Sequence, residues 1–298
     1  MAVNKVNYSL HTHTIGFDGQ NSVEEMVKRA IQLGFSVLGF SNHFIVHPYI
    51  KQSRMYKYAE SGGYADIYSE STDDALTRFI PHYQQVRALQ IKYKNIRLLC
   101  GMEMDLFNYP GWADNVNRAV RILHPDYIIG ARHFLEWTNN RILNIHDIKN
   151  APGQESNQLL RAYYQQFDDD FVDLVMRQIN FDISFFAHFN LPQKLGLVDD
   201  KMENYVLKKL SLMGVPIELN TSLIKNGNYN ASNRLKIFNS ISKTNIPVIL
   251  SDDAHKVSQI GNHFDDVFNQ AWQSGITNIC TNADELQNFI KINVQKKH

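Results

Sequence analysis

The chain has 298 residues, of which 44% are hydrophobic and 20% charged, so it is long enough to bury a substantial core. Its 30 basic and 30 acidic residues balance, which argues against the uniform charge that nucleic acid or an anionic membrane surface would select. No apolar run of roughly 18 residues and no N-terminal signal-like stretch is present. We therefore expect a cytoplasmic protein without nucleic-acid or membrane partners, in which Cys100 and Cys280 are reduced.

Short apolar runs alternate with longer amphipathic segments, which predicts repeated βα units. Several runs are apolar along most of their length, as strands buried on both faces should be. No linker or internal repeat divides the chain, so we expect one α/β barrel domain over residues 1–298. The predicted strands are Val6–Leu10, Ser36–Phe40, Ile96–Gly101, Tyr127–Gly130, Ile183–Ala187, Pro216–Leu219 and Pro247–Leu250, with Ile276–Cys280 as a further candidate.

Helix signals lie between these runs. Ser22 and Glu25 predict a capping box, and Gly34 predicts the end of the same helix. Gly214 predicts the end of a helix over 201–213.

Two stretches are longer than a βα connection requires. Residues 44–95 include a predicted helix over 73–93, and residues 134–180 include one over 156–178. Insertions after barrel strands are either pocket walls and lids or packing elaborations, and the sequence leaves both readings open. We expect both near the active-site face, with the tyrosine-rich segment 44–68 closing over a ligand.

Imidazole and carboxylate groups recur where the predicted strands end. His11 and His13 follow the first strand at i and i+2, so they project to the same side. Further imidazole and carboxylate groups follow the later strands, and one lies in the turn after the first strand. They are Asp18, His43, Glu103, His133, His188, Asp253 and His255. Parallel barrels build their active sites at the carboxyl ends of their strands, so these nine side chains are expected to meet.

A single histidine such as His133 is more often a hydrogen-bonded core residue, and one His-x-His pair is weak evidence for metal. Nine potential ligands at the same relative place in successive βα units predict a polynuclear metal site, and with it a metal-dependent hydrolase.

At these residues the chain resembles the PHP (polymerase and histidinol phosphatase) family, in particular its histidinol-phosphate phosphatase branch. The resemblance is carried by His11-Thr12-His13 with Asp18, His43, Glu103, His133-Phe134, His188 and Asp253-Ala254-His255, and by Ile217-Glu218-Leu219-Asn220-Thr221-Ser222. It implies a distorted seven-stranded (β/α) barrel that holds two or three divalent ions of zinc, iron or manganese.

The resemblance also implies how the ligands divide. The first ion would take His11, His13, Glu103 and Asp253. The second would share Glu103 and add His133 and His188. The third would take Asp18, His43 and His255. A hydroxide between two ions could attack phosphorus in a phosphate monoester.

Further roles follow from the same resemblance. Asp253 or His255 would protonate the leaving alkoxide. Lys194 and Lys225, which follow the fifth and sixth strands, would bind the substrate phosphate, with Arg132 as a third option. The implied substrate is L-histidinol phosphate, an intermediate of histidine biosynthesis, or a similar small phosphate monoester.

The sequence departs from the family pattern at Ser9, Asn42, Ala187 and Asn190. None of these is a proposed ligand, but each could alter how a ligand is oriented. Three alternatives therefore stay open. They are a PHP phosphodiesterase or nuclease, a metal-binding module without catalysis, and an amidohydrolase barrel, although the latter usually relies on a carboxylated lysine where Glu103 stands.

Overall fold

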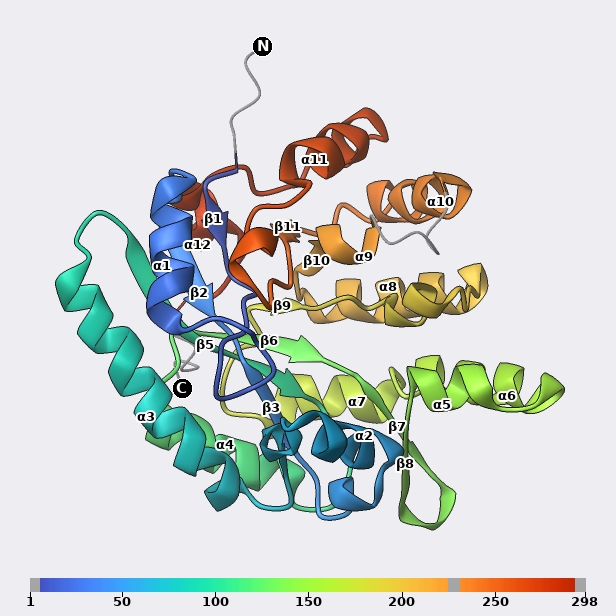
Figure 1. Cartoon of the computed structure of the whole chain (residues 1–298). Coiled ribbons are helices and arrows are strands. Elements are labelled where there is room, and N and C mark those ends of the chain that lie inside the picture. Colours follow the sequence, from blue (N-terminus) through green and yellow to red (C-terminus); the bar gives the residue numbers. More distant parts are fainter. Residues whose placement is uncertain (1–5, 225–230, 293–298) are drawn as a thin grey trace.

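The computed structural model describes residues 6–224 and 231–292. Its strands run through the middle of the molecule with the helices around them (Figure 1). The strands are β1 (Tyr8–Ser9), β2 (Val37–Phe40), β3 (His43–Val46), β4 (Tyr68–Ser69), β5 (Arg97–Asp105), β6 (Tyr127–Ala131), β7 (Phe134–Trp137), β8 (Arg141–Asn144), β9 (Phe185–Phe186), β10 (Ile217–Asn220) and β11 (Val248–Ser251).

The main sheet is parallel and nearly closes on itself. Its strands follow the order β1-β2-β5-β6-β9-β10-β11. The two ends of this order meet just beyond the strands, where Thr12 and Ala254 form a parallel bridge. His13 N donates to Ala254 O at 2.9 Å, and Ala254 N donates to His11 O at 3.0 Å. The predicted seven-stranded, distorted α/β barrel is therefore confirmed.

Strand β5 is longer than predicted and explains where His43 lies. The first half of β5 pairs with β2, and its second half pairs with β3. The register is the same in both halves, with Phe40 opposite Cys100 and His43 opposite Glu103. β2 and β3 thus form one strand that is interrupted at Ser41 and Asn42, and the interruption lies directly below the site.

The seven predicted strands all exist, but the eighth does not. In the run Ile276–Cys280, Ile279 makes only an isolated bridge to Val248. Inside the two long connections, the structure adds pairings that the sequence did not indicate. β4 pairs with β3 in parallel, and β7 and β8 form an antiparallel pair of their own.

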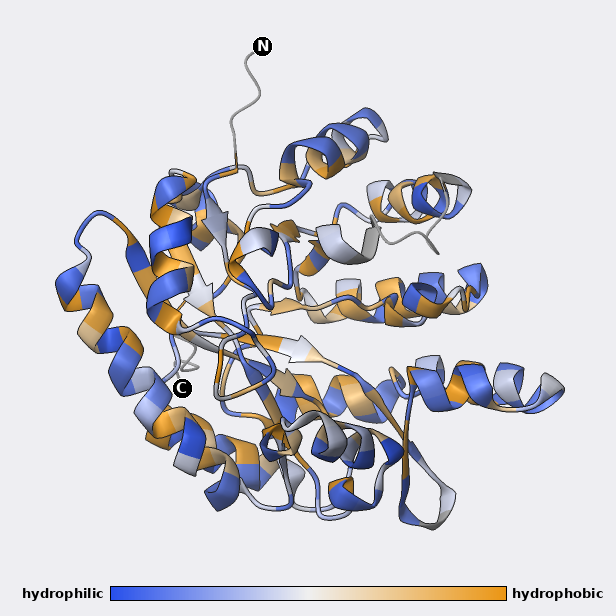
Figure 2. Cartoon of the chain, in the orientation of Figure 1, coloured by the Kyte–Doolittle hydropathy of each residue, from blue (hydrophilic) through white to orange (hydrophobic). Residues whose placement is uncertain are grey.

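The helices turn apolar sides towards the sheet and hydrophilic sides outward (Figure 2). Among the described residues, no helix is long and apolar enough to cross a membrane. The helices are α1 (Val23–Gln32), α2 (Arg54–Gly62), α3 (Thr72–Lys92), α4 (Trp112–Leu123), α5 (Ile145–Asn150), α6 (Gly153–Gln165), α7 (Asp169–Asp173), α8 (Asp200–Met213), α9 (Thr221–Ile224), α10 (Ala231–Ser242), α11 (Phe264–Gln273) and α12 (Leu286–Phe289).

The predicted helix ends are confirmed at both helices. Ser22 and Glu25 form the predicted capping box at the start of α1, and Gly34 follows the helix with a φ of 78°. Gly214 ends α8 in the left-handed conformation, in which glycine has no steric penalty.

The predicted helix over 156–178 is wrong as a single element. The chain leaves α6 after Gln165, and Asp168 then adopts an extended backbone and accepts a hydrogen bond from Phe171 N. The side chain of Asp168 therefore starts a new helix, α7. A π-helical turn, Leu174–Gln178, completes the segment.

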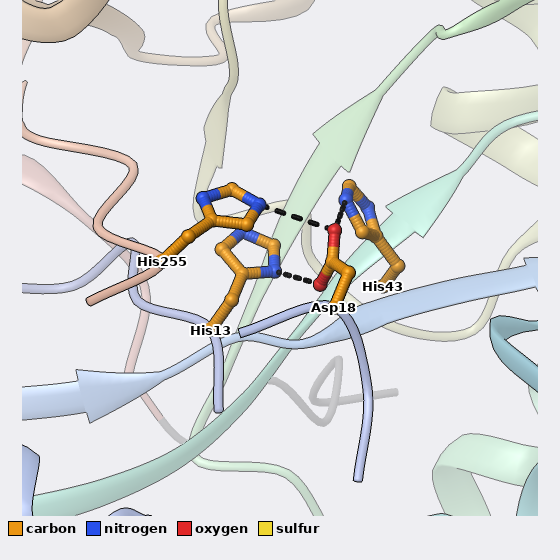
Figure 3. Close-up of side chains that lie close together, drawn as sticks. All are labelled: His13, Asp18, His43 and His255. Carbon is orange, nitrogen blue, oxygen red and sulfur yellow. Dashed lines mark hydrogen bonds and ion pairs between the residues drawn. The ribbon is translucent and has the colours of Figure 1, made fainter. Parts of the chain in front are cut away.

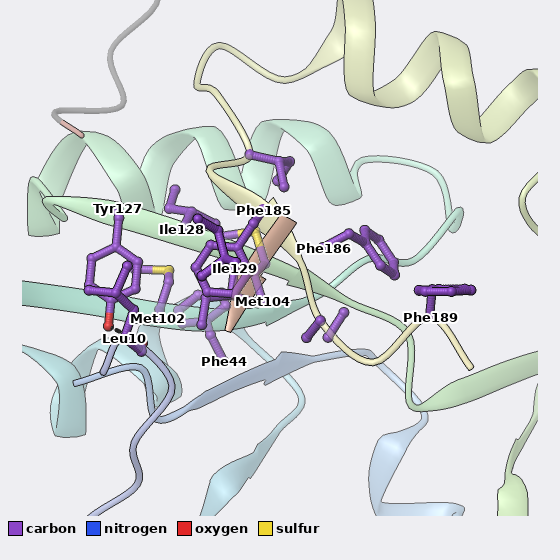
Figure 4. Close-up of a cluster of buried hydrophobic side chains, with 14 of the residues drawn as sticks. Leu10, Phe44, Met102, Met104, Tyr127, Ile128, Ile129, Phe185, Phe186 and Phe189 are labelled. Carbon is purple, nitrogen blue, oxygen red and sulfur yellow. Dashed lines mark hydrogen bonds between the residues drawn. The ribbon is translucent and has the colours of Figure 1, made fainter. Parts of the chain in front are cut away.

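A buried cluster at the barrel centre supports the end of β1 (Figure 4). The ring of Tyr127 lies beneath Gly39 and Gly101, and its hydroxyl donates to Leu10 O at 2.5 Å. A Cβ atom on Gly101 would come within 2.2 Å of this ring. Glycine is therefore required there, and the tyrosine anchors the backbone that precedes His11.

The variant Gly101→Ala should lower the free energy of unfolding by about 3 kcal/mol, because the tyrosine ring is enclosed and cannot retreat. Urea unfolding measures this loss. In a Tyr127→Leu background the same substitution should cost less than about 1 kcal/mol, since the clash is gone. Equal costs in the two backgrounds would contradict the steric explanation.

Candidate metal centre

All nine predicted side chains converge at the carboxyl ends of the barrel strands. His11, His13 and Asp18 lie beyond β1, and His43 begins β3. Glu103 lies within β5, and the remaining four follow the ends of β6, β9 and β11. They are His133, His188, Asp253 and His255. Each of the nine belongs to at least one group whose ligand atoms lie within 4.8 Å of one another. Their role as metal ligands stays a prediction.

Glu103 lies at the centre of the cluster and is fully buried. Its Oε2 atom is 3.3 Å from His11 Nε2 and 3.7 Å from His13 Nε2. Its Oε1 atom is 2.8 Å from His188 Nε2 and 3.5 Å from His133 Nε2. His43 Nδ1 is also 2.7 Å from Oε2. The two oxygens thus face different sets of imidazoles, which is the arrangement that a bridging carboxylate needs.

Asp18 gathers a second group of imidazoles around it (Figure 3). Its Oδ2 atom is 3.2 Å from His43 Nε2 and 3.1 Å from His255 Nε2. Its Oδ1 atom is 3.3 Å from His13 Nδ1. Asp253 stands between this group and Glu103, with Oδ1 at 3.2 Å from His13 Nε2.

The carboxylates of the cluster are ionised. Burial alone would raise the pKa of Glu103, Asp18 and Asp253, but the neighbouring imidazoles outweigh burial and hold each pKa well below its usual range. Burial lowers the pKa of His13, and His255 and His43 lower it further. In four other imidazoles the neighbouring carboxylates outweigh burial and raise the pKa; they are His11, His43, His133 and His255. Metal ions would bind the ionised carboxylates directly and would displace the protons of these imidazoles.

The hydrogen bonding of the cluster also fits metal ions. Among the buried atoms of the described residues that have no hydrogen bond of good geometry, seven belong to the cluster. They are His11 Nε2, both ring nitrogens of His13, Asp18 Oδ1, His43 Nδ1, Glu103 Oε2 and His188 Nδ1. Buried polar atoms normally have a hydrogen-bond partner. The number of unpaired nitrogen and oxygen atoms in this cluster therefore indicates that they bind a common partner such as a metal ion. Nitrogen and oxygen ligands without thiolate suit zinc, iron or manganese.

Two of the nine residues have a strained backbone. His188 has a φ of 25° and Asp253 a φ of 52°, a region that residues with a Cβ atom adopt at a cost of about 1–3 kcal/mol. Both lie directly beyond a short barrel strand, β9 or β11. The strain turns each side chain into the cluster, where a regular strand would continue past it.

Two buried carboxylates that the ligand prediction did not include orient the imidazoles. Glu218 Oε1 lies 2.6 Å from His11 Nδ1, and Glu218 Oε2 accepts from His188 N at 2.8 Å. Asp105 accepts from His133 N at 2.8 Å and lies 2.9 Å from His133 Nδ1. These contacts leave Nε2 of His11 and His133 facing Glu103. The i, i+2 spacing of Asp105 from Glu103 was the available signal for its position.

Asn42, one of the departures from the family pattern, connects the site to α3. Its Oδ1 atom accepts from Thr14 N at 2.8 Å, which fixes the turn before Asp18. Its Nδ2 atom lies 3.0 Å from His82 Nε2. Burial lowers the pKa of His82 to about 4, so this imidazole is neutral and accepts the hydrogen bond. An aspartate could not donate it, which accounts for asparagine.

A cavity of about 360 Å³ opens onto the cluster, and six of the nine side chains line it. Lys194, on the turn Leu191–Leu195, also lines it. Arg132 does not, because its guanidinium is buried and lies 4.8 Å from the ring centre of Phe171. Its position is therefore a correction to the predicted phosphate-binding set. Lys225 lies outside the described residues.

The turn that carries Lys194 is held by a buried network. The side chain of Gln193 donates to Glu203 on α8, and Tyr164 OH donates to the same carboxylate oxygen at 3.3 Å. Burial raises the pKa of Glu203 to about 7. Sequence reasoning missed this carboxylate, because an acid on an amphipathic helix reads as a solvated residue.

A nearly closed parallel barrel with a histidine and carboxylate cluster at the carboxyl ends of its strands defines a class of barrels suited to holding metal ions. Residues 7–222 match the PHP domain family. The chain therefore belongs to the PHP domain family, and the resemblance predicted from the sequence is confirmed.

The chain is similar to several known proteins. One from Deinococcus radiodurans, named probable histidinol-phosphatase, is 25% identical over 263 residues, which is 86% of this chain and 88% of that one. The structure of histidinol phosphate phosphatase from Lactococcus lactis, complexed with zinc, L-histidinol and phosphate, is 14% identical, with a TM-score of 0.63 over 98% of this chain and 99% of that chain. The structure of the HisK protein from Listeria monocytogenes is 18% identical to this chain, with a TM-score of 0.61 over 87% of this chain and 99% of that chain. At these identities, both structures support the fold.

Replacing Glu218 by glutamine should weaken metal binding by about 10- to 100-fold, because one neutral amide cannot accept from both His11 and His188. Equilibrium dialysis against buffered zinc or manganese, followed by elemental analysis, measures the affinity. Glu25→Gln, which alters only the capping box of α1, is the matched control and should bind metal as the unaltered chain does. Equal affinities in the two variants would rule out the orienting role of Glu218.

The raised pKa of Glu203 makes stability depend on pH. The protonated form favours folding, so the contribution is full below the unfolded pKa of about 4.3 and is lost as pH rises through about 7. Through this group the unaltered chain should lose about 2–3 kcal/mol of unfolding free energy between pH 5 and 8, and Glu203→Gln should remove that loss. Urea unfolding at the two pH values measures it. Glu155→Gln, on the exposed side of α6, should keep the original slope. A slope unchanged by Glu203→Gln would refute the assignment.

Proposed function

We propose that this chain is a metal-dependent phosphatase that hydrolyses a small phosphate monoester. The observation that supports this proposal is the convergence of nine imidazole and carboxylate side chains around one cavity in a PHP-family barrel. L-Histidinol phosphate, the ester implied by the sequence resemblance, belongs to this substrate class and is the first ester to test.

The proposed ligand sets follow the distances within the cluster. Glu103 is placed to be shared, with His11, His13 and Asp253 on its Oε2 side and His133 and His188 on its Oε1 side. The group around Asp18, with His43 and His255, would hold a further ion. Bound divalent ions would bring the pKa of a coordinated water towards 7 and offset the negative charge of the phosphoryl oxygens.

The chain's own residues would then position the ester and manage its proton. Lys194, at the cavity wall, supplies a cation for the phosphate oxygens. Asp253 and His255 also line the cavity. Burial lowers the pKa of His255, but Asp18 and Asp253 outweigh burial and raise it, so His255 is the proposed proton donor to the leaving alcohol, whereas ionised Asp253 would first have to take up a proton. Glu218 and Asp105 keep the imidazoles aligned while the ester binds.

The alternatives have less support. A nuclease needs a long basic groove for a polyanion, whereas this cavity of about 360 Å³ suits a small molecule and the chain has no net charge. A metal-binding module without catalysis would not need a cavity that opens onto six of the nine side chains.

The test is phosphate release by the full chain loaded with manganese or zinc. A panel of small monoesters that includes L-histidinol phosphate should yield turnover, a diester such as bis(4-nitrophenyl) phosphate should yield little, and chelation with EDTA should stop the reaction. His133→Ala should lower kcat/KM by about 100-fold or more while the fold is retained. His124→Asn, a histidine outside the cluster at a left-handed position that asparagine tolerates, is the matched control. Full activity of His133→Ala, or metal-independent turnover, would refute the proposal.

A further inference from the structure

Most of the cavity wall outside the metal centre is apolar. It is formed by Ile45, Met55, Ile67, Phe134, Ile145 and Leu191. Tyr64 and Tyr68 complete it, and the rings of Tyr68 and Phe134 meet edge to face at 6.2 Å. Most of these residues come from the two long connections between barrel strands, so the connections, and not the barrel, decide what lies beside the phosphate.

The same wall offers no carboxylate to a cation. Among the described residues that line the cavity, the acids are Asp18 and Asp253, and both belong to the metal centre. The segments outside the described residues, 1–5, 225–230 and 293–298, contain no aspartate or glutamate in the sequence. An ammonium group on the substrate would therefore have to compete with metal ions for its only carboxylate partners.

Nearby acids outside the cavity are already engaged or face away from it. Asp147 Oδ2 accepts from Asn144 N at 3.0 Å, and Glu136 Oε2 accepts from Asn108 N at 2.8 Å. Asp66, between two residues that line the cavity, is exposed.

The polar groups on the wall are neutral, apart from Lys194. Asn144 Oδ1 already accepts from His146 N at 2.7 Å and from Asp147 N at 3.1 Å, so its amide NH₂ is the group left to offer. Lys194 also lines the cavity and is the proposed partner of the phosphate. Neutral polar groups and apolar side chains give an ammonium group no anionic partner.

We propose that the alcohol part of the substrate is uncharged and apolar, in the class of aryl and arylalkyl phosphates, and carries no ammonium group. This inference rests on the proposed phosphatase function and narrows its substrate. It separates the site from amino-alcohol esters, including L-histidinol phosphate. Burying an ammonium against an apolar wall without a carboxylate partner is unfavourable, whereas an aromatic ring gains from burial there.

The test compares two esters that differ by the ammonium group alone, 3-phenylpropyl phosphate and L-phenylalaninol phosphate, with the full chain loaded with manganese. The value of kcat/KM for the uncharged ester should exceed that for the ammonium ester by about tenfold or more. An equal or higher value for the ammonium ester would overturn this inference and leave the phosphatase proposal standing. Absence of turnover with every monoester, in protein shown to hold metal, would overturn both.

A pair of variants at one wall position tests the cause. Met55, partly buried on α2, becomes a carboxylate in Met55→Glu and a neutral residue of the same size in Met55→Gln. Met55→Glu should shift the ratio of the two kcat/KM values towards the ammonium ester by about fivefold. Met55→Gln should leave the ratio within about twofold of the starting value. A shift of the same size in both variants would overturn the electrostatic explanation.

Discussion

The burial of one carboxylate organises this site. Glu103 is removed from solvent within β5, and five imidazoles approach it within 3.7 Å. An isolated buried charge would cost several kcal/mol, so this position is stable only while groups from other strands surround it. The barrel supplies those groups, because strands distant in sequence end beside one another around the same opening. The nearly closed sheet is therefore what allows the charge of Glu103 to be buried.

The contacts that hold the cluster in place come from both the barrel and its long connections. Buried acids on β5 and β10 hold the imidazoles from within the barrel. The connections add the apolar wall and, through His82 on α3, the hydrogen bond that holds Asn42. The proposed metal centre thus rests on the barrel strands, while the long connections supply the apolar wall beside it.

The sequence predicted the features that recur in each βα unit, and it did not predict the features that depend on tertiary contacts. Apolar runs and the rule that parallel strands present their carboxyl ends together were enough to place the seven barrel strands and the nine polar positions. The rule could not place Glu218, since a buried acid within a strand has no pattern of its own. It could not show that β3 continues β2, because Ser41 and Asn42 interrupt the apolar run. Arg132 lies just beyond the end of β6, and its guanidinium packs against the ring of Phe171 on α7, a tertiary contact that the sequence could not indicate.

The left-handed backbone at His188 and Asp253 has an evolutionary consequence. Glycine or asparagine would fit these two corners with less backbone strain, so the strain at each corner is tolerated for the side chain that points into the cluster. A chain that no longer needed the cluster would have no reason to keep histidine and aspartate at these corners. In a related barrel, the residue at each corner offers a simple marker: histidine and aspartate would suggest a site still maintained for chemistry, and glycine at both would suggest a scaffold that has been released from it.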